Sequence, residues 1–177
     1  MLGPSEILGC ILTLVLLLRM PSYVLAAVKF SLCSNVNTSD SRLTKYLTLA
    51  KDHLAIANDL ASYDKEKRDF DSGASHDIIN VVDVVQQLMS LPDSDSAKTT
   101  AYTYQLQTEA WMVQEIQRMD REEQLTSEQW QYLEAVYVCA AGNVFFSMTS
   151  SRYGGETARL HAFCEHNTTR KFRYTQI

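Results

Sequence analysis

The 177-residue chain lacks the patterns that mark several common functional classes. Its net charge is −5, and no run of Lys or Arg lies on an expected helix face, so it has no electrostatic footprint for nucleic acid. No C-x-x-C pair occurs, and no cysteine has a histidine at a zinc-like interval. We therefore expect reduced, packed thiols at Cys10, Cys33, Cys139 and Cys164, and surface or satisfied polar side chains at His53, His76, His161 and His166.

An apolar run long enough to span a membrane is also missing. The longest run, Ile7–Leu18, falls short of the roughly 20 apolar residues that a spanning helix needs, so we expect no stable membrane span. Val24-Leu25-Ala26 would pass as a signal-peptidase site, but the segment before the run carries Glu6 where a signal peptide has Lys or Arg.

Two interpretations of this N-terminus stay open. In the first, residues 1–26 are a signal peptide, the protein is secreted, and the sequons at Asn37 and Asn167 can accept glycans. In the second, residues 1–22 are a helix fragment or a gene-model artefact, and the protein is cytoplasmic. The missing basic flank and the cysteine pattern favour the second interpretation.

After residue 32, the chain has a helical pattern nearly throughout. Apolar residues recur at three- and four-residue spacing, and no alternating runs between turn signals are present, so the fold class is all-α. Four helices are expected: from Ser39 or Asp40 as cap to about Lys67, from His76 to Leu91, from Thr99 to Glu123, and from a Thr126–Gln129 capping box to about Ser150.

The expected connections and faces follow from the same pattern. The stretch Arg68–Ser75, with its Gly73, is expected to form a loop, and Asp93–Lys98 a polar linker. The third helix is expected to turn five large apolar side chains inward: Tyr102, Leu106, Trp111, Val113 and Ile116.

One nine-residue segment of the first long helix carries metal-binding chemistry. In Asn58-Asp59-Leu60-Ala61-Ser62-Tyr63-Asp64-Lys65-Glu66, the side chains of Asn58, Ser62 and Glu66 follow at four-residue intervals, about 40° apart around the helix. An amide oxygen, a hydroxyl and one carboxylate on one face form a hard, weakly charged set. Such a set suits Mg²⁺, which expects phosphate oxygens of a ligand to complete its shell. A solvated polar stripe is the alternative for these three positions alone.

The whole segment resembles the N-D-x-x-S-x-x-x-E motif of class I terpene synthases at every defined position. Lys65 stands just before the glutamate, as is frequent in that family. A second resemblance follows in Gly142-Asn143-Val144-Phe145-Phe146-Ser147-Met148-Thr149-Ser150-Ser151-Arg152-Tyr153, whose ending is similar to the Arg-Tyr pair of fungal and bacterial terpene cyclases. The order and spacing of the two motifs support each other.

The resemblance implies a function and assigns roles to residues. A family member ionises a linear prenyl diphosphate with Mg²⁺, or with Mn²⁺ as the alternative, and cyclises the carbocation; farnesyl diphosphate is the expected substrate. By the resemblance, Asn58, Ser62 and Glu66 bind metal, whereas Lys65, Arg152 and Tyr153 hold the diphosphate. Phe146 would face the cation as a cavity aromatic, ahead of Phe145 and Tyr137 as lesser candidates; core packing is the alternative.

The family's aspartate-rich D-D-x-x-D/E motif, which holds two of three Mg²⁺ ions on an earlier helix, is missing from this sequence. We therefore expect residues 23–160 to form the C-terminal part, roughly half, of a class I terpenoid synthase α-helical domain, followed by a polar tail at residues 161–177. Residues 23–32 would be what remains of the preceding helix.

A truncated domain of this kind has consequences for activity and partners. We expect it to be inactive alone and to expose a broad apolar surface, which favours self-association or pairing with a full-length synthase. The alternative function is a non-catalytic helical binding or regulatory protein derived from a terpene synthase.

Overall fold

The structure, a computed structural model, describes residues 21–122 and 125–150. These residues form helices and no strand, which confirms the all-α prediction. The helices are α2 (Pro21–Ser31), α3 (Ser41–Asp71), α4 (Val81–Leu88), α5 (Ser94–Glu122) and α6 (Ser127–Thr149). The helix expected at residues 23–32 is present as α2.

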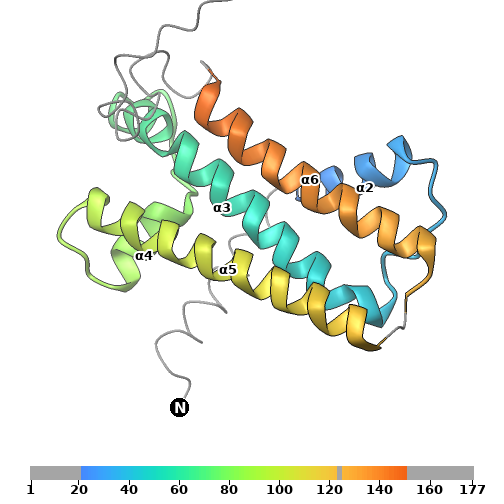
Figure 1. The fold of residues 1–177 in the computed structure, drawn as a ribbon. Helices are drawn as coiled ribbons and strands as arrows, with labels where there is room; N and C mark the ends of the chain where they lie inside the picture. The colour runs from blue at the N-terminus through green and yellow to red at the C-terminus, as the bar shows by residue number, and fades with distance from the viewer. Residues whose placement is uncertain (1–20, 123–124, 151–177) are drawn as a thin grey trace, which may run out of the picture.

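The long helix α3 lies between α5 and α6, with α4 and α2 near its opposite ends (Figure 1). Helix α5 runs antiparallel to α3. Three side-chain pairs show this: Lys45 Nζ lies 2.7 Å from Glu115, His53 Nε2 2.9 Å from Glu109, and Lys98 Nζ 2.7 Å from Asp64. As the residue number rises along α3, it falls along α5.

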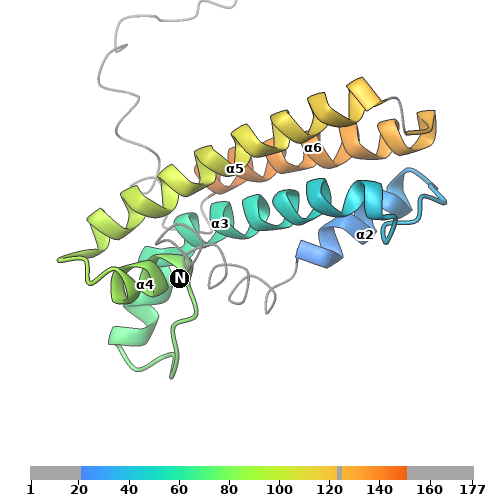
Figure 2. The same ribbon diagram turned by 90° about the horizontal axis from the view of Figure 1, so that it is seen from below.

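Helix α6, in contrast, runs parallel to α3. Gln129 donates to Asp40, Tyr46 donates to the carbonyl of Leu133, and Asn143 donates to the carbonyl of Leu54; the paired residues are 89, 87 and 89 positions apart. This nearly constant offset defines the register of the two helices. Seen from below, α5 and α6 lie on the same side of α3 (Figure 2).

Both helix starts that the sequence assigned to a capping side chain are correct. The carboxylate of Asp40 accepts from the backbone N–H of Arg42 at 2.9 Å, and the adjacent guanidinium of Arg42 holds the pKa of Asp40 far below its usual range. At the start of α6, Thr126 and Gln129 form the complete capping box, with bonds of 3.2 and 2.9 Å. Helix α6 ends at Thr149, close to the expected Ser150.

The boundaries of three other elements were predicted wrongly. Helix α3 continues to Asp71, so the loop is shorter than expected; Gly73 then adopts a φ of +75°, which suits glycine. Helix α4 begins at Val81 instead of His76 and ends at Leu88 instead of Leu91. The expected linker from Asp93 is the first turn of α5, because the Asp93 carboxylate accepts from the N–H of Ser96 at 2.7 Å.

The inward face expected for the third helix is also wrong. Tyr102, Leu106, Trp111 and Val113 are exposed, and of the five predicted residues Ile116 packs against the core. The buried face of α5 instead carries small, polar and methionine side chains: Ala97, Ala101, Gln105, Thr108, Met112, Glu115 and Met119. Small residues let α5 approach α3 closely and leave the large apolar ones outside.

The buried apolar residues form two clusters along α3. The first surrounds its N-terminal half and joins α2, α5 and α6: Leu25, Val36, Leu43, Tyr46, Leu47, Ala50, Met112, Met119, Tyr132, Leu133 and Val136. The second surrounds its C-terminal half and joins α4 and α5: Ala55, Ile56, Tyr63, Val81, Val82, Val85, Ala97 and Ala101. The second cluster has smaller side chains and lies beside the candidate site.

Cys33 and Cys139 are free thiols in the described part of the chain. Cys139 is partly buried, which raises the pKa of its thiol, but Cys33 is exposed, so the expectation of packing is wrong there. Cys10 and Cys164 lie outside the described residues. In residues 21–122 and 125–150, no helix has the length and apolar character to cross a membrane.

Candidate functional site

The predicted metal-binding side chains share one face of α3, near its C-terminal end. Ser62 stands at the centre of this face and is only 4% exposed, and its Oγ makes no hydrogen bond with residues 21–122 or 125–150. Asn58 and Glu66 lie one turn before and one turn after it, both partly buried. A buried hydroxyl without a partner is costly, about 1–3 kcal/mol, so this position needs a reason other than stability.

Glu66 is held by a network at the start of α4. The amide nitrogen of Asn80 donates to Glu66 Oε2 at 3.2 Å and to the backbone carbonyl of Asp59 at 2.9 Å. The amide oxygen of Asn80 caps α4 by accepting from the N–H of Val82 at 2.9 Å. The carboxylate of Asp59 accepts from the N–H of Val81 at 2.8 Å. The first turn of α4 is therefore tied to the start and the end of the motif on α3.

Lys65 lies on the outer side of the same helix. Its side chain is exposed, and its ammonium forms an ion pair with Asp69 at 2.9 Å. Position 65 is about 60° from Ser62 around the helix, toward the side that α6 covers. The structure therefore places Lys65 at the rim of the face, with its charge bound by Asp69.

Helix α6 brings a second set of side chains to the level of this face. By the offset of 89 positions that Asn143 and Leu54 define, Ser147 lies at the level of Asn58. The Oγ of Ser147 is also buried and makes no hydrogen bond within the described part of the chain. Arg152 and Tyr153, expected to hold the diphosphate, lie outside the described residues, shortly after the end of α6 at Thr149.

The three aromatic candidates on α6 differ in direction. Phe146 is 51% exposed and lies about 60° from Asn143 around the helix, so it occupies a flank next to the contact with α3. Phe145, 70% exposed, and Tyr137, 48% exposed, point farther from that contact. Phe146 is thus the aromatic side chain of α6 that lies nearest to the side of the motif.

A polar layer separates the two apolar clusters. His53 is buried instead of lying at the surface; its Nε2 bonds to Glu109, but its Nδ1 has no partner in residues 21–122 and 125–150, so the expectation of a satisfied side chain holds for one ring nitrogen. His76 is exposed as expected, and His161 and His166 lie outside the described residues. Six residues before the motif, burial raises the pKa of Asp52 to about 6.

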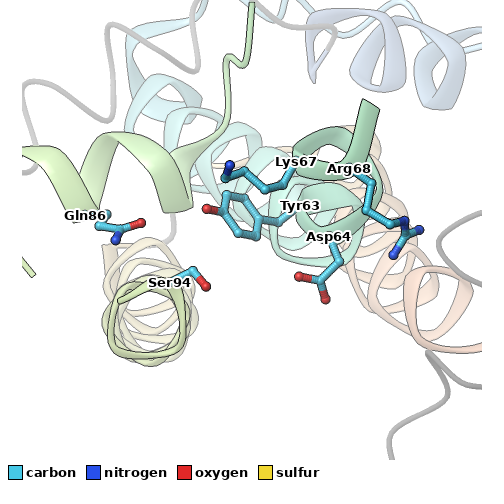
Figure 3. A pocket seen from close by; sticks show the side chains of 6 residues that line it. All are labelled: Tyr63, Asp64, Lys67, Arg68, Gln86 and Ser94. Atoms are coloured by element: carbon cyan, nitrogen blue, oxygen red, sulfur yellow. The ribbon is translucent and has the colours of Figure 1, made fainter. Parts of the chain in front are cut away.

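A pocket of about 380 Å³ opens on the other side of α3 (Figure 3). It lies between α3, α4 and the start of α5, and is lined by Tyr63, Asp64, Lys67, Arg68, Gln86 and Ser94. Two cations line it, Lys67, which pairs with Asp71, and Arg68; the lining carboxylate Asp64 pairs with Lys98. Asn58, Ser62 and Glu66 do not line this pocket, so it is distinct from the face that carries them.

The face of α3 formed by Asn58, Ser62 and Glu66, here called the Ser62 face, has side chains that suit a hard cation. An amide, a hydroxyl and one carboxylate are oxygen ligands of low total charge, as Mg²⁺ prefers when phosphate completes its shell. Mn²⁺ accepts the same ligands. Among the described residues, no group of three His, Cys, Asp or Glu side chains could hold a metal, so a carboxylate-rich centre has no counterpart here. The buried, unbonded Ser62 hydroxyl fits such a cation.

The sequence analysis missed two side chains of this region. Asn80 was placed inside a helix, although an Asn directly before an apolar run is a capping signal that could have moved the start of α4. Ser147 belongs to the second motif but was not singled out, because its burial depends on the contact between α6 and α3. Asn143, also in that motif, donates from its side chain to the backbone carbonyl of Leu54 on α3 at 3.3 Å.

Comparisons with known proteins complete the description. No protein-family model matches the chain. It is 30% identical over 134 residues to "Terpene cyclase 6" of Gibberella fujikuroi, covering 74% of this chain and 35% of that protein. It is 31% identical over 108 residues to "Terpene cyclase aneC" of Aspergillus aculeatus, covering 61% of this chain and 24% of that protein. The chain is thus similar to fungal terpene cyclases and spans about a third or less of their length, a smaller part than the half expected.

Proposed function

We propose that this chain carries the second metal-binding helix of a class I terpene cyclase and contributes to the Mg²⁺-dependent ionisation of a linear prenyl diphosphate, with farnesyl diphosphate as the expected substrate. The similarity to two fungal terpene cyclases supports the reaction class. The observation that carries the proposal is the Ser62 hydroxyl, which is buried between Asn58 and Glu66 on one helix face and has no hydrogen-bond partner among the described residues.

Each residue has a definite role in this proposal. Asn58, Ser62 and Glu66 hold the cation, and Lys65, Arg152 and Tyr153 bind the diphosphate oxygens. When bound, Mg²⁺ neutralises charge that develops on the diphosphate as it leaves, an effect worth several kcal/mol. Lys65 would exchange its ion pair with Asp69, at 2.9 Å, for a phosphate oxygen. Phe146 would present its ring to the carbocation and help to exclude water.

Ion binding by the full chain tests the proposal directly. Mn²⁺ is paramagnetic and broadens NMR signals of nearby amides, so its site can be located without turnover. We expect the backbone signals of Ser62 and Glu66 to broaden first, and inorganic diphosphate to strengthen the effect. In a Glu66→Ala variant, the broadening should disappear, whereas a Glu128→Ala variant at the far end of α6 should behave as the wild type. Equal Mn²⁺ binding by wild type and Glu66→Ala would refute the proposal.

The outer face of α6 favours a second candidate function, a non-catalytic partner of a full-length synthase. From Ala135 to Ser150, α6 and its C-cap contain no charged residue. Five of the side chains there are large, apolar and exposed: Tyr137, Val138, Phe145, Phe146 and Met148. Since the matched relatives are more than twice as long as this chain, we propose that a full-length synthase of the same organism covers this face.

Co-expression separates the two functions. If the chain is a non-catalytic partner, it should co-purify with the full-length synthase, and Glu66→Ala should leave that synthase's activity unchanged. If the chain contributes its own cation site, Glu66→Ala should lower the activity of the pair. A chain that runs as a monodisperse monomer in light scattering, alone and with the synthase, would contradict the partner function.

A further inference from the structure

We infer that Asn80 is a positioning residue for Glu66: its side-chain amide fixes the direction of the carboxylate that binds the cation. The inference rests on the proposed function of the Ser62 face. It concerns a residue outside the nine-residue motif, in the turn before α4, which reaches the motif through the fold alone.

Hydrogen bonds hold the side-chain amide of Asn80 at both ends. The side chain is fully buried, at 0% exposure, and uses both ends of its amide. The oxygen accepts from the N–H of Val82 at 2.9 Å, so it cannot rotate without uncapping α4. The nitrogen then points at the Asp59 carbonyl, 2.9 Å away, and at Glu66 Oε2, 3.2 Å away. The capping bond of Asn80 to α4 therefore also fixes the direction in which its side-chain NH₂ points.

This arrangement matters because Glu66 is the charged member of the proposed cation site. A glutamate side chain at a partly buried helix position has several rotamers, and each would aim the carboxylate differently. A fixed donor on Oε2 selects one of them, and a carboxylate, with about four lone-pair sites, can accept this bond and still bind a cation. Hydrogen bonds of this kind to metal ligands typically change metal affinity 10- to 100-fold.

A purely structural role for Asn80, as the cap of α4, predicts a different outcome. In that case, loss of the amide would lower the melting temperature and leave ion affinity unchanged. Asn80→Asp separates the two roles, because aspartate caps a helix as well as asparagine does but has no amide donor. Its second oxygen would face Glu66 Oε2 and the Asp59 carbonyl, and repulsion would turn Glu66 away.

The experiment measures Mn²⁺ affinity on the full chain from the broadening of the Ser62 amide signal, in four proteins: wild type, Asn80→Asp, Glu66→Ala and the double variant. Thr126→Ala is the matched control, since it removes a helix cap at the far end of the bundle. We expect Asn80→Asp to weaken Mn²⁺ binding about tenfold. Thr126→Ala should lower the melting temperature without changing the affinity. Asn80→Asp should have no further effect on ion binding once Glu66 is alanine.

A second readout needs no metal. The side-chain NH₂ signal of Asn80 should shift in Glu66→Gln, because its charged acceptor is replaced by a neutral one. If Asn80→Asp does not fold, Asn80→Ser takes its place, because serine keeps a capping oxygen and is too short to reach Glu66.

The outcomes distinguish the inference from the function on which it rests. Loss of Mn²⁺ binding in Glu66→Ala with wild-type affinity in Asn80→Asp would overturn the positioning role alone. An equal loss of affinity in Thr126→Ala would overturn it as well, because the effect would then follow stability. Failure of the wild type to bind Mn²⁺, or unchanged binding in Glu66→Ala, would overturn the proposed function and the inference together.

Discussion

The two halves of α3 have different surroundings. The N-terminal half lies among large apolar side chains from α2, α5 and α6, with Tyr46 and Tyr132 fully buried. The C-terminal half packs on small side chains of α4 and α5 and buries polar groups beside them, namely Asp59, Ser62 and Asn80. One helix thus combines an apolar core, which stabilises the fold, with a polar face that carries the proposed chemistry.

This difference has an energetic meaning. Burying the unbonded Ser62 hydroxyl costs about 1–3 kcal/mol, which is a large fraction of the net stability of a small domain. The apolar half offsets this cost, because each fully buried large side chain contributes about 1.5–3 kcal/mol. Substitutions in the N-terminal half of α3 should therefore change stability more than ion binding. Substitutions around Ser62 should change ion binding more than stability.

The largest effect is expected in the apolar half. Tyr132→Ala removes a fully buried ring at the junction of α2, α3 and α6 and should lower the free energy of unfolding by about 3–5 kcal/mol. Urea denaturation followed by circular dichroism measures this loss. Tyr102→Ala, at an exposed position of α5, is the control and should change stability by less than about 0.5 kcal/mol. A loss below about 1 kcal/mol at Tyr132 would show that this cluster is not the main core.

Asp52, near the boundary between the halves, should make stability depend on pH. Burial raises its folded-state pKa from 3.8 to about 6, so the folded state holds the proton more tightly and stability falls as pH rises through this window. Asp52→Asn should therefore stabilise the protein at pH about 8 by about 1–2 kcal/mol, after a discount for partial exposure, and have little effect below pH about 4. Urea denaturation at both pH values checks this, with the exposed Asp120→Asn as control.

Ser62→Ala should reverse the usual sign of a substitution at a buried position. Removing an unbonded buried hydroxyl should raise the unfolding free energy by about 1 kcal/mol, while Mn²⁺ binding weakens. Ser147→Ala removes the other unbonded hydroxyl of this region and is the matched comparison for stability. Calorimetry and Mn²⁺ titration on the same samples measure both quantities. A destabilised Ser62→Ala would mean that the hydroxyl contributes to folding.

The smallest effect on stability is expected on the outer face of α6. Phe145 is 70% exposed, so Phe145→Ser should change the unfolding free energy by less than about 0.5 kcal/mol. It should nevertheless reduce association, because it interrupts a surface without charge. Light scattering over a range of concentrations measures the particle mass. If the wild type associates and Phe145→Ser has the same particle mass, the contact lies elsewhere.

Local signals predicted part of this structure well. The capping residues Asp40 and Thr126 were identified from the sequence because a cap involves only neighbours in the chain. The shared face of Asn58, Ser62 and Glu66 also follows from helix geometry alone. By contrast, the start of α4 was misplaced, since the apolar spacing extends back to Ile78 although the helix begins after Asn80.

The errors concern contacts between distant segments. The large apolar side chains of α5 were expected inside, but Ala101 and Thr108 face α3, and which stripe is buried depends on how closely two helices approach. The burial of Ser62, the reach of Asn80 to Glu66 and the pairing of His53 with Glu109 likewise arise from packing between helices. No spacing rule within one helix predicts them.

The parallel register of α3 and α6 also has a consequence for the order of folding. Contacts between α3 and α5 begin with residues 34 positions apart, Asp64 and Lys98, whereas the hydrogen bonds that join α6 to α3 or its cap connect residues 87–89 positions apart. Closing so long a loop costs entropy before any contact repays it, and non-local contacts slow folding. We therefore expect α3 and α5 to assemble first and α6 to dock last. The part of the bundle in which Asn58 and Ser147 lie at the same level would then form in the final kinetic phase of folding.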